Sequence, residues 1–450
     1  MIGGLPAARL LSMCYMLCST GFVYTTAKLL YGRGTGLCAA GFWVTFAPAL
    51  QLSAFATFDG LSVALTACAA WLVVRTATSP KLGEMVALSG VVLGIAGVTA
   101  YSGLVMIPVV VIFAMFVWMS SMSFKQAAAC AAWFGAAAGV TFAVIMTVCK
   151  TWPGITTTVL ARQVNTAGYS SASHVFHDSW SYIGIVAIFA AVGAVFALSS
   201  GDRKLGAQTL YLAAIALVIP IAQAHETTAV SLRKHLAYSG IFAVMAAGYG
   251  LTRFAKSLPA KRWAVVACCL AAFIAPAVDG IDQTLNWYHS WPDASSLVAK
   301  LQPYIGSHPV IAMGLGANNY LCYYEYANLG SLWETNCIQG VTLSTARSMR
   351  AQYIVLGYQD FVEPASGLPA DLLLSPQADR SSFLKFLGEE NTPNSPQNPD
   401  LAELSQFLET SGKYKLVAVG PYDSDQSAAV YTIWQRVSPS QTAVAEAVKS

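Results

Sequence analysis

The chain has 450 residues, of which 56% are hydrophobic and only 10% are charged. Soluble domains carry roughly 25% charged residues, so this chain cannot cover a water-facing surface along its whole length. With a near-neutral net charge of +3, the composition excludes a soluble enzyme, a nucleic-acid-binding protein and a disordered protein. Residues 1–290 hold 16 Lys and Arg against 7 Asp and Glu, whereas residues 291–450 hold 9 against 15. We therefore expect the two parts to lie in different surroundings, one in the membrane and the other in water.

Apolar runs in residues 1–290 reach or approach the roughly 20 residues that a helix needs to cross a bilayer. They predict a polytopic α-helical membrane protein with about ten spans. The spans are expected near residues 8–30, 36–54, 60–77, 84–98, 103–121, 127–149, 181–199, 207–223, 236–254 and 263–280. The fourth and fifth are short and meet near Ala100, which predicts two half-length helices that turn back and need protein or water around their backbone.

Basic residues are unevenly shared between alternate connections. One set holds eleven: Lys28, Arg33, Arg75, Lys81, Lys125, Arg203, Lys204, Arg253, Lys256, Lys261 and Arg262. The opposite set holds five: Arg9, Lys150, Arg162, Arg233 and Lys234. Because cytoplasmic loops are rich in Lys and Arg, the pattern predicts a multi-pass cytoplasmic membrane protein whose C-terminal domain is extracytoplasmic. Met1 then starts outside without a basic leader region, so we expect that upstream sequence is missing.

From about Trp291 the composition becomes that of an α/β soluble domain, expected over residues 291–438 and followed by a flexible tail at 439–450. Runs rich in Val, Ile and Tyr predict strands. The predicted strands are residues 310–313, 353–356, 414–419 and 429–434, and the predicted helices are residues 294–305 and 401–410. A polar, Pro-rich loop is expected at 386–400.

Ten cysteines are present, and most of them lie in or beside predicted spans, where a small packing residue is the simplest interpretation. Only Cys322 and Cys337 fall in the tail. Because that compartment is predicted to be oxidising, a disulfide between them is expected. No further residues nearby have the spacing that a zinc site requires.

Ionisable residues beside a membrane core are costly and therefore indicate function more often than elsewhere. Asp59 lies at the predicted outer start of the third span, with no Lys or Arg within fifteen residues on either side. It could be an N-cap that accepts amide hydrogen bonds. A general base or a metal ligand is the competing interpretation.

A second cluster comprises His225 and Glu226, followed by Arg233, Lys234 and His235 before the next span. These basic residues lie on the predicted outer face, although most Lys and Arg residues lie in the predicted cytoplasmic loops. Adjacent positive charge beside a helix N-terminus is a physical basis for binding phosphate. Anchoring to lipid headgroups is the alternative.

The segment 150–182 carries amides, hydroxyls and aromatic rings, a mixture that sugars favour. Its candidate substrate-binding residues are Arg162, His177 and Asp178. His174 with His177 and Asp178 could also bind a divalent metal. Ordinary outer-loop composition explains the same segment, so both interpretations stay open.

Several motifs follow one another in a recognisable order. They are Ala8-Arg9-Leu10-Leu11-Ser12, Leu30-Tyr31-Gly32-Arg33, Pro48 followed by Asp59, Gly94 and Gly97 before Tyr101-Ser102-Gly103 and Pro108, and Arg233-Lys234-His235 before Tyr238. In this order the chain resembles the GT-C glycosyltransferases, in particular the dolichyl-phosphate-mannose protein mannosyltransferase-like family that includes lipid A aminoarabinose transferases. The resemblance covers roughly residues 1–290.

The resemblance implies a glycosyltransferase that uses a sugar on polyprenyl phosphate, with a glycan, lipid or protein as acceptor. Arg233, Lys234, His235 and Arg9 would then hold the donor phosphate. Asp59 would be the catalytic residue, because the acidic loop after the family's first span has no counterpart here; the alternative is a base in missing upstream sequence. His225, Glu226, Tyr101, Arg162, His177 and Asp178 would contact substrate. Where the family commonly has Lys before the Tyr-Ser-Gly turn, this chain has Ala100.

Such chemistry is coherent, because fixed cations stabilise a leaving phosphate and a carboxylate can take the proton of an acceptor hydroxyl. One displacement at the anomeric carbon would invert its configuration. No cofactor is indicated with certainty, and a divalent metal stays open. The alternatives are a non-catalytic member of the same scaffold that binds lipid or glycan, and a transporter or flippase. No second copy of the short helix pair is found, which disfavours a transporter.

Overall fold

In the computed structural model, the described residues are 4–77, 82–155, 170–229, 231–258, 262–290, 310–312, 353–357, 404, 406–408, 410–421 and 430–437. The chain divides into two compact units. One consists of residues 6–285, and the other combines residues 1–5 with 286–450. Each unit is considered by itself.

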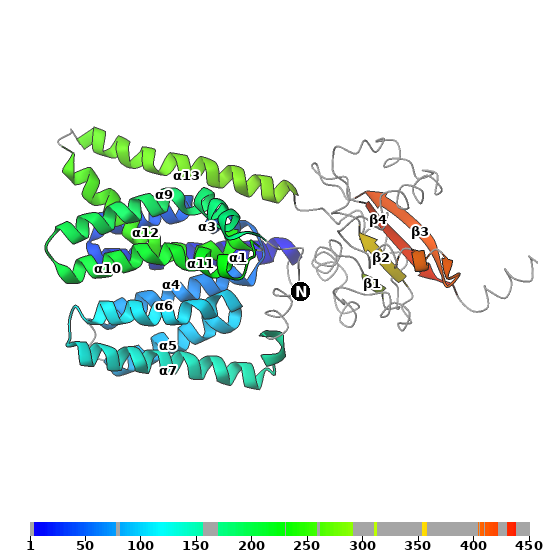
Figure 1. The fold of residues 1–450 in the computed structure, drawn as a ribbon, viewed down its shortest axis with the longest axis horizontal. Coiled ribbons are helices and arrows are strands. Elements are labelled where there is room, and N and C mark those ends of the chain that lie inside the picture. The colour runs from blue at the N-terminus through cyan, green and yellow to red at the C-terminus, as the bar shows by residue number, and fades with distance from the viewer. Residues whose placement is uncertain are drawn as a thin grey trace, which may run out of the picture. The chain divides into compact units, whose positions relative to one another are not determined.

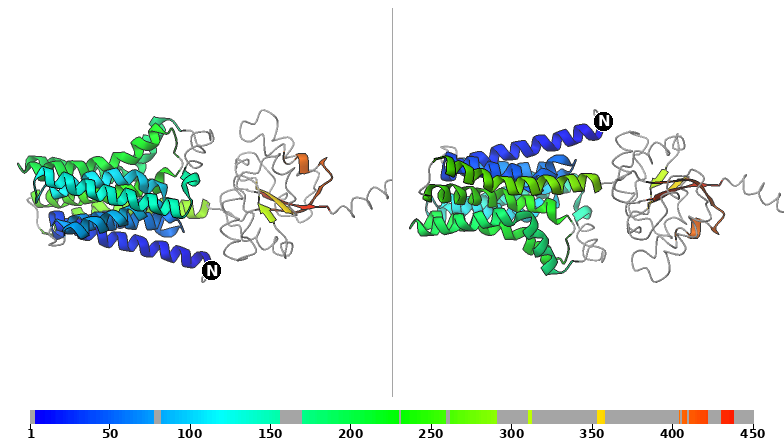
Figure 2. Two further views of the ribbon diagram at one scale, coloured as in Figure 1. Left: turned by 90° about the horizontal axis from the view of Figure 1, so that it is seen from below. Right: turned by 90° about the horizontal axis from the view of Figure 1, so that it is seen from above.

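The first unit is a helical bundle in the part of the chain that the structure describes (Figure 1). Its helices are α1 (Gly4–Tyr31), α2 (Arg33–Thr45), α3 (Ala47–Ala54), α4 (Phe58–Thr76), α5 (Leu82–Thr99), α6 (Tyr101–Trp118), α7 (Phe124–Val148), α9 (Ala172–Ser199), α10 (Arg203–Ala214), α11 (Val218–His225), α12 (Leu232–Ser257) and α13 (Arg262–Ser290). The short η2 (Ile215–Leu217) joins α10 to α11. In both views of Figure 2, α1, in dark blue, lies along one side of the bundle.

Seven helical segments among the described residues are long and apolar enough to cross a membrane, and the bent pair α2–α3 would make an eighth. The seven are α1, α4, α5, α6, α7, α9 and the α10–α11 segment. The prediction of a polytopic helical membrane protein is therefore confirmed. The other two predicted spans correspond to α12 and α13, helices of 26 and 29 residues, so the count of ten stays a prediction.

One local prediction was wrong. The fourth and fifth spans are not half-length helices, because α5 and α6 have 18 residues each and a single extended residue, Ala100, separates them. The second predicted span, residues 36–54, corresponds to the bent pair α2–α3. It bends by 60° at Phe46, and Pro48 explains the break because it has no N–H to continue the hydrogen-bond ladder of α2.

Helix α12 is the centre of the bundle, in contact with α2, α3, α4, α6, α9, α10 and α11. Its side chains are buried from Leu236 through Leu251. Small residues permit this close packing, as they do between membrane helices in general. A Cβ atom on Gly193 of α9 would overlap the carbonyl oxygen of Ala246, and one on Gly248 would lie 2.6 Å from the Ala39 amide of α2. Since neighbouring helices surround α12, it does not need an apolar exterior.

In the second unit, four described strands form one sheet in the order β1-β2-β4-β3. They are β1 (Val310–Ala312), β2 (Tyr353–Gly357), β3 (Tyr414–Pro421) and β4 (Val430–Arg436). β1 and β2 are parallel, and the other pairings are antiparallel. All four predicted strands are thus confirmed to within two residues. The predicted disulfide Cys322–Cys337, the helix at 294–305, the loop at 386–400 and the tail at 439–450 lie outside the described residues.

Candidate active site

The site is built around the first turn of α12, where three basic residues follow one another. The turn before it is tight, because Thr227 and Ser231 both have positive φ, at 52° and 61°. Ser231 is the N-cap residue but its side chain makes no capping hydrogen bond. Successive residues of an α-helix point about 100° apart, so Arg233, Lys234 and His235 face three different parts of the bundle.

Lys234 faces α4. Its Nζ donates a hydrogen bond to Oδ2 of Asp59 over 2.9 Å, and the hydroxyl of Tyr238 donates to Oδ1 over 3.2 Å. Tyr238 lies one helical turn after Lys234, on the same face of α12. Asp59 is 6% exposed, whereas the Lys234 side chain is 31% exposed. The acid is therefore buried and its cationic partner still reaches the surface of the site.

Asp59 is not the N-cap of α4, so that alternative interpretation was wrong. The N-cap residue is Thr57, and Asp59 lies in the first turn of the helix. Its carboxylate contacts α12 rather than the end of its own helix. A carboxylate at this place is favoured by the positive end of the α4 dipole and by the Lys234 cation.

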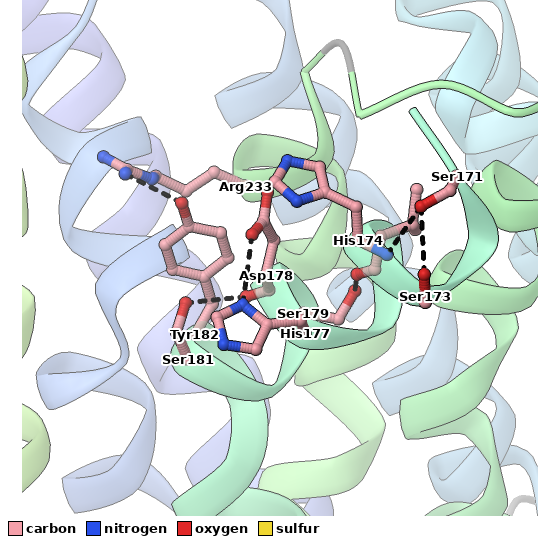
Figure 3. Close-up of polar contacts among 10 residues, drawn as sticks. Ser171, Ser173, His174, His177, Asp178, Ser179, Ser181, Tyr182 and Arg233 are labelled. Atoms are coloured by element: carbon pink, nitrogen blue, oxygen red, sulfur yellow. Dashed lines mark hydrogen bonds and ion pairs between the residues drawn. The ribbon is translucent and has the colours of Figure 1, made fainter. Parts of the chain in front are cut away.

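Arg233 faces α9 and α13 and is half-buried. It donates from Nη2 to the hydroxyl of Tyr182 over 2.9 Å and from Nη1 to the carbonyl oxygen of Gln283 over 3.4 Å. Its Cζ also lies 4.6 Å from the centre of the Tyr182 ring, a cation–π distance. Figure 3 shows Arg233 and Tyr182 in contact at this place. The guanidinium therefore has a fixed position between two other helices.

His235 faces α11 and is only 5% exposed. Its Nδ1 lies 2.7 Å from Nε2 of Gln223. This arrangement ties the start of α12 to the end of α11. A direct contact between His235 and a phosphate stays a prediction.

The first turns of α9 carry the other polar residues of this region (Figure 3). Nε2 of His174 lies 3.3 Å from Oδ2 of Asp178, and Nδ1 of His177 lies 3.6 Å from Oδ1. Tyr182 follows Asp178 one turn later, so this cluster adjoins the residue that holds Arg233. Among the described residues, no three His, Cys, Asp or Glu side chains are grouped so that they could hold a metal ion.

The remaining predicted residues lie around the same end of the bundle or outside the described part. Ser12 of α1 packs near Gly60, the neighbour of Asp59. Arg9 lies one helical turn before Ser12. Tyr101 begins α6, and two residues later Gly103 packs against Ser62, one turn after Asp59. His225 and Glu226 are exposed at the end of α11. Arg162 lies outside the described residues.

Four residues that hold the site together were not among the predicted site residues: Tyr182, Gln223 and Gln283, which contact the basic residues, and Tyr238, which contacts Asp59. For Tyr238 a signal existed, since it lies four residues after Lys234 and therefore on the same helical face. Tyr182, Gln223 and Gln283 belong to other helices. Only the three-dimensional packing brings them to α12.

An ion pair between the buried Asp59 and the partly exposed Lys234, with a half-buried arginine beside it, thus lies at one end of a polytopic helical membrane protein. Residues 4–148 match the family model of dolichyl-phosphate-mannose-protein mannosyltransferase. This match confirms the resemblance to the GT-C glycosyltransferases for those residues. No curated protein matches the chain significantly in sequence.

Solved structures with a similar course of the chain include two transferases. The oligosaccharyltransferase AglB from Archaeoglobus fulgidus, in complex with an inhibitory peptide and a dolichol-phosphate, has a TM-score of 0.46 and 11% identity. That similarity covers 78% of this chain and 58% of AglB, so the chain spans less than two thirds of that protein. ArnT from Cupriavidus metallidurans in the apo state has a TM-score of 0.49 and 12% identity, covering 94% of this chain and 83% of ArnT. Such likenesses assign neither substrate nor mechanism.

Proposed function

We propose that the chain is a membrane glycosyltransferase that moves a sugar from a polyprenyl-phosphate donor to an acceptor hydroxyl on the outer face of the cytoplasmic membrane. The observation that carries this proposal is the arrangement of Arg233 and Lys234, two adjacent cations that partners on α4, α9 and α13 hold at one end of the bundle. The family match over residues 4–148 supports the transferase class. The acceptor is a glycan, a lipid or a protein.

In the proposed reaction, the bond between the anomeric carbon and a phosphate oxygen breaks and the polyprenyl phosphate leaves as an anion. Arg233 and Lys234 stabilise this developing charge. Because Tyr182 and Gln283 already hold Arg233 in place, this cation needs little reorganisation during the reaction, which is the condition under which such groups are most effective. The planar guanidinium of Arg233 can offer a phosphate two parallel hydrogen bonds.

The acceptor hydroxyl forms the new bond to the anomeric carbon and loses its proton. Asp59 is the carboxylate that pairs with Lys234, at 2.9 Å. Both its oxygens already accept hydrogen bonds, from Lys234 and Tyr238. When Lys234 turns to the phosphate, Oδ2 of Asp59 becomes available to accept the proton. Binding of the donor would thereby activate the base, and a single displacement would invert the anomeric carbon.

Exposed polar residues around the site are proposed to contact the sugar or the acceptor. His177 and Asp178 lie on α9, Tyr101 begins α6, and His225 and Glu226 end α11. His235 contributes by fixing the start of α12, through its contact with Gln223. Arg9 is proposed to add positive charge from α1.

The test is sugar transfer by the purified chain in lipid nanodiscs, with a panel of polyprenyl-phosphate sugars and detection of the product by mass spectrometry. Arg233→Ala is expected to lower the transfer rate by about 10²–10³-fold, as for loss of one donor to a developing anion. Arg233→Lys should recover only part of the rate, because Lys lacks the planar fork. Arg203→Ala is the matched control, since Arg203 is exposed at the start of α10.

The alternatives give different outcomes in the same preparation. A transporter or flippase would move the donor lipid between leaflets, and Arg233→Ala would leave that flux intact. A non-catalytic binding protein would bind the donor with no turnover. Transfer by Arg233→Ala at the wild-type rate, in a folded protein, would contradict the proposed role of Arg233.

A further inference from the structure

The Asp59 carboxylate accepts one hydrogen bond on each of its two oxygens, and the two donors differ in their surroundings. Lys234 donates to Oδ2 and is partly exposed, whereas Tyr238 donates to Oδ1 and is completely buried. One oxygen therefore faces the open side of the site and the other faces the interior of the bundle. The proposed reaction gives a role to Lys234 and Oδ2 but not to Tyr238 and Oδ1.

The orientation of the carboxylate depends on these two hydrogen bonds. The terminal torsion of an aspartate side chain is broad and roughly two-fold, so it does not by itself fix where each oxygen points. Once Lys234 turns to the phosphate, the hydrogen bond from Tyr238, over 3.2 Å, is the one that remains to Asp59 among the described residues. It keeps Oδ1 on the buried side and leaves Oδ2 toward the place that Lys234 has left.

Ser62 lies on the other side of the Tyr238 hydroxyl. It follows Asp59 by one turn of α4, is completely buried, and contacts Tyr238 through its side chain. Its own proton goes to the carbonyl oxygen of Ala96 on α5, over 2.7 Å. The Tyr238 proton is therefore left for the stronger of its two neighbouring acceptors, which is the charged carboxylate.

Gly103, in the Tyr101-Ser102-Gly103 motif at the start of α6, provides the space for this group of side chains. A Cβ atom on Gly103 would lie 2.6 Å from Oγ of Ser62 and 2.7 Å from the Ala96 carbonyl oxygen, too close for any side chain. A larger residue would displace Ser62, which contacts Tyr238. The motif therefore has a physical connection to Asp59, although it lies on a different helix.

We propose that Tyr238 is a positioning residue that fixes the Asp59 carboxylate through Oδ1, so that Oδ2 is the atom that takes the acceptor proton. This inference rests on the proposed function and assigns the base to one oxygen atom. The acceptor oxygen bonds to the anomeric carbon as the bond from that carbon to the phosphate oxygen breaks, and its proton passes to Oδ2. Tyr238 keeps its own proton throughout.

The test is sugar transfer by Tyr238→Phe in nanodiscs, with the same panel of polyprenyl-phosphate sugars. The substitution keeps the buried ring and removes only the hydroxyl. Because a misplacement of about 1 Å in a reacting group can cost 10²-fold, kcat is expected to fall at least about tenfold. KM for the donor and the affinity for decaprenyl phosphate should stay at their wild-type values, since Arg233 and Lys234 are unchanged.

Two further variants separate positioning from a loss of stability. Tyr211→Phe is the matched control, because the Tyr211 hydroxyl donates to the Val109 carbonyl oxygen over 2.7 Å, between α10 and α6 and outside the site. It loses a tyrosine hydrogen bond of the same kind and should keep the wild-type kcat. Tyr238→3-fluorotyrosine, introduced by an expanded genetic code, retains the hydroxyl and should recover most of the kcat that Tyr238→Phe loses.

Gly103→Ala reaches the same group from α6 and serves where Tyr238→Phe does not fold. It should lower kcat without changing KM for the donor, because Ser62 must move. Gly139→Ala is its control, since nothing lies within 4 Å of the Cβ position there.

Three results would overturn the inference while the proposed function stands. They are a wild-type kcat in both Tyr238→Phe and Gly103→Ala, an equal fall of kcat in Tyr238→Phe and Tyr211→Phe, and a loss of donor affinity in Tyr238→Phe as large as the loss of kcat. The last would place Tyr238 at the donor phosphate instead of at Asp59. Absence of transfer by the wild-type chain with every donor of the panel would refute the proposed function, and the inference with it.

Discussion

The two ends of α12 carry similar residues in very different surroundings. At its start, Arg233, Lys234 and His235 each have a partner on another helix. At its other end, Arg253 and Lys256 are exposed, and the described contact of Arg253 is with Tyr249 of its own helix, 5.9 Å from the ring centre. One end is built into the bundle, and the other has the form of an ordinary membrane anchor.

The helix dipole explains what this difference means. Cations are favourable at the C-terminus of a helix and unfavourable at its N-terminus, by about 0.3–1 kcal/mol each. Arg253 and Lys256 follow this preference and can contact lipid headgroups. Arg233 and Lys234 oppose it, so their cost must be offset by partners or by an anionic ligand. Position within a helix therefore distinguishes the cations of the proposed phosphate site from those at the other end of α12, although both are basic residues at a membrane boundary.

Removing the partner of Lys234 tests this comparison with the largest expected effect. Asp59→Leu should lower the free energy of unfolding by about 3 kcal/mol, the lower end of the cost of breaking a buried ion pair, since Lys234 is partly exposed. Sugar transfer should be lost as well. Denaturant unfolding in detergent micelles measures the first effect. Asp59→Leu combined with Lys234→Met should recover most of the stability but none of the transfer, and a single variant as stable as wild type would contradict this account.

A substitution at Gly193 of α9, which packs against the middle of α12, tests whether close packing holds the start of α12 in place. Gly193→Leu should lower the free energy of unfolding by about 2 kcal/mol, within the range for overpacked cores, because its Cβ would overlap the carbonyl oxygen of Ala246. Gly139→Leu is the matched control, since nothing lies within 4 Å of the Cβ position there. The thermal midpoints of the two purified variants should differ clearly. Equal midpoints would show that the contact between α9 and α12 can relax.

The link between α11 and α12 is expected to matter less. Gln223→Leu removes the side-chain amide that contacts Nδ1 of His235, and one such hydrogen bond contributes about 1 kcal/mol. Transfer should fall only severalfold, mainly through a higher KM for the donor. A loss as large as that expected for Arg233→Ala would instead place His235 in contact with the phosphate.

The smallest effect is expected at the far end of α12. Arg253→Ala should change the free energy of unfolding by no more than about 0.5 kcal/mol and leave transfer at its wild-type rate. The same unfolding and transfer measurements check this. A large loss of activity would show that the exposed end also takes part in function and would remove the contrast between the two ends.

The features of the fold that depend on local sequence patterns could be predicted. Apolar runs predicted the helices, runs of Val, Ile and Tyr predicted the four strands, and the spacing of charges identified Asp59 and the cluster at 233–235. Pro48 was visible in the sequence, but whether a proline bends a span or merely begins a new helix depends on packing. The turn near Ala100 was predicted, but the full length of the two helices was missed for a related reason: glycines such as Gly103, whose Cβ would lie 2.7 Å from the Ala96 carbonyl oxygen, let α5 and α6 pack closely.

The partners within the site could not be predicted in the same way. Lys234 and Asp59 are 175 residues apart in the chain, and Arg233 and Tyr182 are 51 apart. Hydrophobic patterning sets which face of a helix is buried but not which neighbour covers it. The single direction in which each of the three basic residues points therefore had to come from the structure.

The central place of α12 also bears on how the chain enters the membrane during synthesis. Its start carries three basic residues, and α12 is not among the described helices that are long and apolar enough to cross a membrane. Most of its partners, on α4, α9 and α11, precede it in the chain and are made first. Only α13 follows. It follows that α12 is expected to insert against helices already in place, and that the order of elements along the chain is itself part of how this charged helix reaches the interior of a membrane protein.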